Sequence, residues 1–128
     1  MYQRKSIKYK AIFKQDGNTE TIEYNAQGIL HKGDMNCLSF QTKENTIDIR
    51  YGNDEICLKS NDSLLHFHLN NEIWNDYKLP YGSIPLRTKV LLFETNDNHI
   101  KMKYELYDQS SLITTAYLLI SIRPLEEL

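Results

Sequence analysis

Residues 100–106 read Ile-Lys-Met-Lys-Tyr-Glu-Leu, and residues 114–122 read Thr-Thr-Ala-Tyr-Leu-Leu-Ile-Ser-Ile. In the first segment apolar and polar side chains alternate, and a period of two is typical of a β-strand with one dry and one solvated face. The polar residues 108–111 are typical of a short hairpin loop. The two segments therefore predict a pair of long antiparallel strands near the end of the chain.

The same alternation recurs upstream, where short segments rich in Gly, Asn and Asp separate the apolar runs. Gly28 within one run suggests a bulge or a bend. With the closing pair, the chain has about nine strands, a number that closes into a barrel more readily than it stays open. We expect an all-β fold, an antiparallel meander closed into a barrel of about 8–10 strands. The further strands are expected at residues 5–13, 22–30, 35–41, 46–51, 55–59, 64–69 and 86–95.

Residues 72–85 are less regular and combine aromatic side chains with two prolines, which argue against a central strand. We expect a rigid corner here instead. Its aromatic residues Trp74, Tyr77 and Tyr81 are candidates for contact with a partner protein, because Trp and Tyr are favoured at contact hot spots. Packing of the corner against its own barrel is the alternative interpretation.

The chain has 128 residues, which predicts a single domain over residues 1–128 with one core. Its net charge of -2 gives no general attraction to nucleic acid or to an anionic membrane. Residues 1–5 lead directly into a strand without an apolar signal segment, so we expect a cytoplasmic protein. Cys37 and Cys57 are then expected to be reduced thiols.

The sequence offers little for catalysis. His66 and His68 share one face of a strand, but two histidines without a third ligand favour a solvated face over a metal site. Cys37 is expected in the core, since free cysteine is often buried. We find neither a nucleophile motif nor a phosphate-binding glycine loop. No enzyme, metal or cofactor is therefore expected.

The chain resembles the YwiB-like proteins of the DUF1934 group, small bacterial proteins. Residues 77–82, Tyr-Lys-Leu-Pro-Tyr-Gly, are similar to the group's Tyr-x-Thr-Pro-Tyr-Gly corner, with Leu79 in place of Thr, and residues 84–86 follow as Ile-Pro-Leu. Residues 100–106 match an apolar-x-apolar-x-Tyr-x-Leu pattern. A further departure is Lys59, near where the group carries Arg. The resemblance extends from about Arg4 to Arg123 and implies a calycin, or lipocalin-like, barrel without an established activity.

A barrel of about eight strands is filled by side chains or holds one small ligand. The interior residues Tyr9, Tyr24 and Tyr104 are candidates to orient the polar end of a small apolar or amphipathic ligand. Arg87 is a candidate to pair with a carboxylate if it faces inward, a point that the apolar run 91–93 of the same strand leaves open. A filled core is an equally weighted alternative. The competing function is a non-enzymatic interaction or homo-oligomerising module that uses the aromatic corner or a strand edge. Either a monomer or a homodimer fits these expectations.

Overall fold

The computed structural model describes residues 2–125 and contains ten strands and no helix over that range. Among these residues no helix is long and apolar enough to cross a membrane. The strands are β1 (Tyr2–Gln15), β2 (Asn18–His31), β3 (Asn36–Gln41), β4 (Thr46–Tyr51), β5 (Glu55–Ser60), β6 (Ser63–His68), β7 (Ile73–Leu79), β8 (Gly82–Thr95), β9 (His99–Tyr107) and β10 (Leu112–Pro124).

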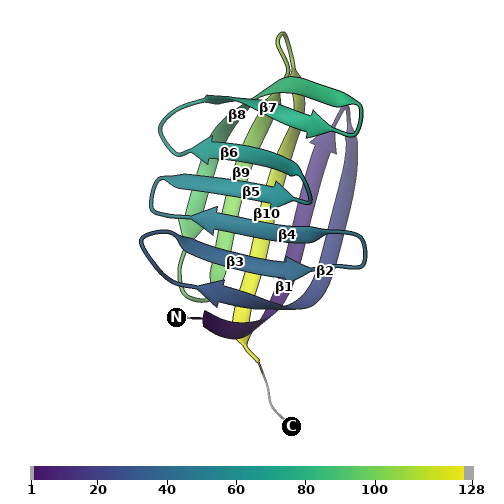
Figure 1. Ribbon diagram of the computed structural model, residues 1–128. Helices are drawn as coiled ribbons and strands as arrows, with labels where there is room; N and C mark the ends of the chain where they lie inside the picture. Colours follow the sequence, from purple (N-terminus) through teal and green to yellow (C-terminus); the bar gives the residue numbers. More distant parts are fainter. Residues whose placement is uncertain (1, 126–128) are drawn as a thin grey trace.

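All ten strands form one antiparallel sheet in the order β6-β5-β4-β3-β2-β1-β10-β9-β8-β7. Strands that follow each other in sequence are neighbours, except that β6 and β7 are the two edges and β1 pairs with β10 instead. The sheet curls so that β3 to β7 cross in front of the long strands (Figure 1). The predicted all-β barrel is confirmed, and it is nearly closed.

The closing hairpin of β9 and β10 forms as the alternation predicts. Met102 pairs with Leu118 and Tyr104 with Ala116, and all four side chains are buried. In the loop, the Asp108 carboxylate accepts hydrogen bonds from the backbone N–H groups of Ser110 and Ser111, both 2.9 Å long, and these bonds lower its pKa.

The core fills the space between the two halves of the curled sheet, and most of its members are aliphatic. Gly28 is needed where β2 passes close to β3, because a Cβ atom there would lie 2.7 Å from the Ser39 carbonyl oxygen. Neither ladder of β2 shifts register at Gly28, so it serves close approach and not a bulge. The buried apolar residues are Ile7, Ala11, Leu30, Leu38, Phe40, Ile47, Ile49, Tyr51, Ile56, Phe67, Leu86, Ile100, Met102, Tyr104, Ala116, Leu118, Ile120 and Ile122.

The expectation of an irregular corner over residues 72–85 is wrong, because β7 and the start of β8 form a regular hairpin there. Two features make the prolines tolerable. Pro80 lies in the turn, and Pro85 lies opposite Asp76 before the ladder between β8 and β9 begins at Arg87. The missing N–H of Pro85 therefore removes no hydrogen bond from the ladder between β8 and β9.

The assignment of Cys37 to the core is also wrong. Its neighbour Leu38 is fully buried, so the half-buried Cys37 side chain belongs to the opposite, outer face. Cys37 and Cys57 are both free. They lie on β3 and β5, and each is opposite Arg50 of the intervening strand β4. They are thus two strand spacings apart, about 10 Å, which is too far for a disulfide.

Candidate functional site

Three tyrosines that the sequence assigned to the interior do face the core. Tyr9 and Tyr24 are partners across β1 and β2, with ring centroids 5.7 Å apart. Tyr104 on β9 packs against Phe67 of β6 with an edge-on geometry and a centroid distance of 4.7 Å. Phe40 adds a third neighbour, 5.8 Å from Tyr9. The interior thus contains a cluster of aromatic rings contributed by both halves of the sheet.

Burial and neighbouring tyrosines raise the pKa values of two of these tyrosines. Burial, followed by the neighbouring Tyr24, raises the pKa of Tyr9 to about 12. The pKa of Tyr104 is also raised, first by burial and then by Tyr9 and Tyr77. Both phenol groups therefore keep their protons well above neutral pH.

No side-chain hydrogen bond within residues 2–125 involves the hydroxyl of Tyr9, Tyr24 or Tyr104. Over the same residues, however, no buried side-chain oxygen or nitrogen lacks a partner. Both observations hold together only if each of these hydroxyl oxygens keeps some solvent-accessible area. The tyrosine cluster therefore offers hydrogen-bonding groups within an otherwise apolar interior.

We call the end of the barrel that holds the hairpins β1–β2 and β7–β8, drawn at the upper right in Figure 1, its mouth. Along the inner face of β8, exposure rises from 4% at Leu86 to 41% at Ile84. On β1 the inward residues change from the buried Ala11 to the half-buried Phe13. At the mouth, the inward-facing apolar side chains Phe13 and Ile84 are therefore more exposed than those deeper in the barrel.

Arg87 does not join this cluster, because Leu86 and Thr88 on either side of it face the core. On the outer face its guanidinium donates a hydrogen bond to Glu72. It also lies 4.4 Å from the ring centroid of Tyr107 and 5.8 Å from that of Trp74. These contacts hold Arg87 outside the barrel.

The three aromatic residues of the expected corner do not form one surface. Trp74 is 54% exposed on the outer face, whereas the half-buried Tyr77 has the inward orientation of its β7 neighbour Asn75. Tyr81 lies in the turn between β7 and β8 and is 87% exposed. The sequence did carry the signal for Tyr77, since apolar Ile73, Tyr77 and Leu79 recur at a period of two.

His66 and His68 lie on the outer face of β6, on either side of the buried Phe67. The two histidines line a hollow of about 550 Å³ with Arg50 and Cys57. Within residues 2–125 no group of three His, Cys, Asp or Glu residues is placed to hold a metal ion.

The raised pKa of Tyr9 predicts a loss of stability at high pH. An unfolded tyrosine loses its proton near pH 10, whereas folded Tyr9 keeps its proton to about pH 12. The stabilising contribution is complete below pH 10, and it falls as the pH rises through this window, because the unfolded chain binds fewer protons. Tyr9→Phe should flatten the decline, measured by urea unfolding across the window. Parallel declines in wild type and variant would contradict the assignment.

Comparisons with known proteins agree with the fold. A family model described as a domain of unknown function, DUF1934, matches residues 7–120. The crystal structure of the ywiB protein from Bacillus subtilis is similar with a TM-score of 0.80 and 15% sequence identity, and the match covers 98% of this chain and 94% of that chain. No curated protein matches the chain. At this identity the structural likeness concerns the fold alone.

Proposed function

The chain belongs to the DUF1934 family, and from that premise we propose that it is a calycin-like binding protein that holds a small apolar or amphipathic ligand in the mouth of its barrel. In this proposal the protein binds its ligand in the cytoplasm, catalyses no reaction and uses no cofactor. The family description names no activity, so the support comes from the interior of the barrel.

The observation that carries this proposal is the set of tyrosine hydroxyls without protein partners in an apolar surrounding. Tyr104 is only 6% exposed, yet its hydroxyl retains access to water. A ligand with one polar end would accept hydrogen bonds from the hydroxyls of Tyr9, Tyr24 and Tyr104, while its apolar body contacts Phe13 and Ile84. Carboxylate recognition by an arginine is not part of the proposal, since Arg87 lies outside.

A second candidate is a protein-interaction or homo-oligomerising module centred on Trp74. This side chain lies on an edge strand and exposes 54% of its surface, and an exposed tryptophan is a common contact anchor. Native mass spectrometry of the purified protein separates the two candidates. A small mass released on unfolding supports the ligand barrel, whereas an empty dimer supports the module.

Tyr104→Phe and Tyr24→Phe should weaken binding of the amphipathic fluorescent probe anilinonaphthalene sulfonate. Each removes one hydroxyl donor, and loss of one hydrogen bond corresponds to about a three- to tenfold rise in Kd. Fluorescence titration measures the affinity, and thermal unfolding checks that both variants are folded.

Arg87→Ala is the matched control. Arg87 and Tyr104 belong to the same hairpin, β8–β9, but the Arg87 side chain lies on the outer face. The affinity of this variant should equal that of the wild type. If all three variants bind the probe with wild-type affinity, the tyrosine cluster is not the site.

A further inference from the structure

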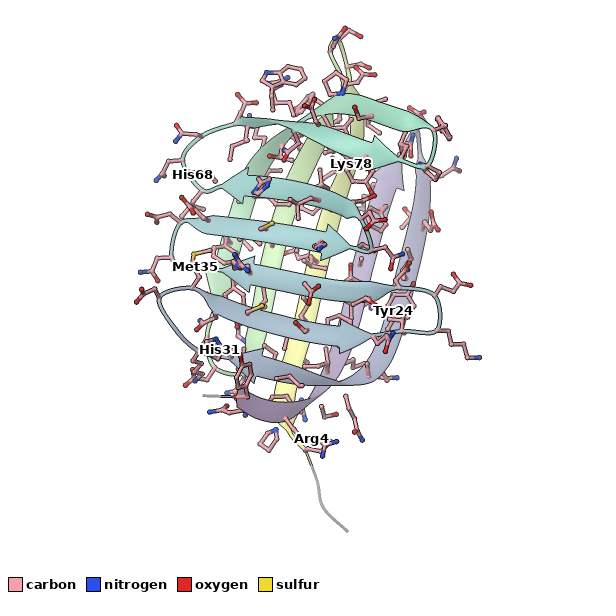
Figure 2. The ribbon with its side chains drawn as sticks, in the orientation of Figure 1. Arg4, Tyr24, His31, Met35, His68 and Lys78 are labelled. Carbon is pink, nitrogen blue, oxygen red and sulfur yellow. The ribbon has the colours of Figure 1, made fainter. Side chains whose placement is uncertain are left out.

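The barrel has one seam, between the edge strands β6 and β7. No ladder joins them among the described residues, and the pairing of His68 with Asn71 is an isolated bridge at one end. In contrast, β1 and β10 are joined by continuous pairing from Lys5 to Lys14. Figure 2 labels His68 and Lys78 toward opposite ends of this seam.

A buried amide side chain takes the place of a backbone partner at the centre of the seam. The Asn75 Oδ1 atom accepts a hydrogen bond of 2.8 Å from the His66 N–H, and Asn75 Nδ2 donates to the His66 carbonyl at 3.2 Å. Thr88 Oγ1 donates to the same carbonyl at 2.7 Å. Asn75 is 6% exposed and Thr88 is fully buried. We call these two side chains, Asn75 and Thr88, the latch, because their hydrogen bonds join the backbone of β6 to β7 and β8.

Hollows flank the latch on both sides. One, of about 990 Å³, is lined by residues 59–64 of the β5–β6 hairpin and by residues 76–80 of β7 and its turn. The other, of about 550 Å³, includes residues 66–68 and Ile73. Within residues 2–125, the only further hydrogen bond between β6 and β7 near the first hollow is from Ser63 Oγ to the Lys78 carbonyl, at 2.8 Å. Few bonds must therefore break for β6 and β7 to separate.

The seam also leads directly to the tyrosine cluster. Phe67 follows His66 on β6, points inward, and packs edge-on against Tyr104. A small outward movement of β6 would carry Phe67 away from Tyr104 and expose the interior. Regions joined by few backbone hydrogen bonds open at lower free energy than continuous ladders.

We propose that the seam between β6 and β7 is the portal through which a small amphipathic ligand enters the barrel, with Asn75 as the positioning residue that keeps it closed. This inference rests on the proposed ligand-binding function. The portal opens by local separation of the two edge strands, while the remaining nine strand pairings stay intact.

Hydrogen exchange of the ligand-free protein tests whether the seam opens locally. Ile120→Val in the core of β10 lowers global stability without touching the seam. Protection of the Leu118 amide should fall in this variant, and protection of the His66 amide should not. A parallel fall at both amides would show that His66 exchanges only by global unfolding, which overturns the inference.

Stopped-flow binding of anilinonaphthalene sulfonate tests whether the opening serves entry. In Asn75→Ala the association and dissociation rates should both rise, by about five- to tenfold, with little change in Kd, because the latch alone is weakened. Asn75→Asp keeps the acceptor for the His66 N–H and should give intermediate rates. Ile120→Val is the control and should bind at wild-type rates.

The outcomes separate the portal from the function. Probe binding with unchanged rates in Asn75→Ala would leave the ligand site standing and exclude the seam as its entrance. A wild-type protein that binds no probe and releases no co-purified mass would refute the proposed function, and the portal would fall with it.

Discussion

Leu118→Asp is expected to abolish folding. Leu118 is 3% exposed on β10 and lies between Ala11 of β1 and Met102 of β9, both buried. A buried carboxylate without a partner, added to the lost leucine contacts, costs on the order of 5 kcal/mol or more. This approaches or exceeds the whole stability of many domains, which is about 5–15 kcal/mol. Circular dichroism and size-exclusion chromatography of the purified variant would show the loss.

Leu119→Asp is the matched control one residue away. Leu119 faces outward between Lys10 and Lys101, and a carboxylate there has both solvent and opposite charges. This variant should fold with a stability change within about 1 kcal/mol. A folded Leu118→Asp protein together with an unfolded Leu119→Asp protein would place the register one residue from that described here.

The regular strands were predictable because their side chains alternate strictly. Over residues 7–13, 22–30 and 100–106 one face of the strand is apolar, so sequence alone assigned Tyr9, Tyr24 and Tyr104 to the interior, as the structure confirms. A period of two leaves only one register in which the apolar face is buried.

Alternation did not predict which face points inward in strands that contain a bulge. The run Leu91-Leu92-Phe93 hides the inward face because β8 carries a bulge between Val90 and Leu92. That uncertainty extended to Arg87, whose outward position follows from the buried Leu86 and Thr88 on either side of it. A bulge interrupts the period of two, so local alternation no longer assigns the two faces of such a strand.

The seam between β6 and β7 could not be predicted from the sequence either. The residues around Asn75 do not indicate that its side-chain amide bonds to the backbone of another strand. The same local sequence would suit an asparagine exposed to solvent on a strand. Its role follows from the order of the sheet, in which the chain's meander places β6 and β7 at the two edges. The number of strands predicted a barrel. The position of its unpaired seam depends on which two strands become the edges of the sheet, and that is known only from the strand order.

Phe67→Ala should lower the free energy of unfolding by about 3–5 kcal/mol, the range for removing a large aromatic side chain from a packed core. Phe67 is 1% exposed, and its ring packs edge-on against Tyr104. Urea unfolding measures the change. Phe93→Ala is the control, because Phe93 is only partly buried at the margin of the core and should lose less.

The cavity left by Phe67→Ala would adjoin the Tyr104 ring, and this makes the variant a second test of the interior as a binding site. Phenol should refill the space, since its ring replaces the lost aromatic surface and its hydroxyl can bond to a tyrosine hydroxyl. Binding to the folded state alone raises the urea midpoint with phenol concentration. Phenol should not stabilise Phe93→Ala. A Phe67→Ala protein that is destabilised yet unaffected by phenol would show a collapsed interior, because only an accessible cavity beside Tyr104 can link phenol binding to stability.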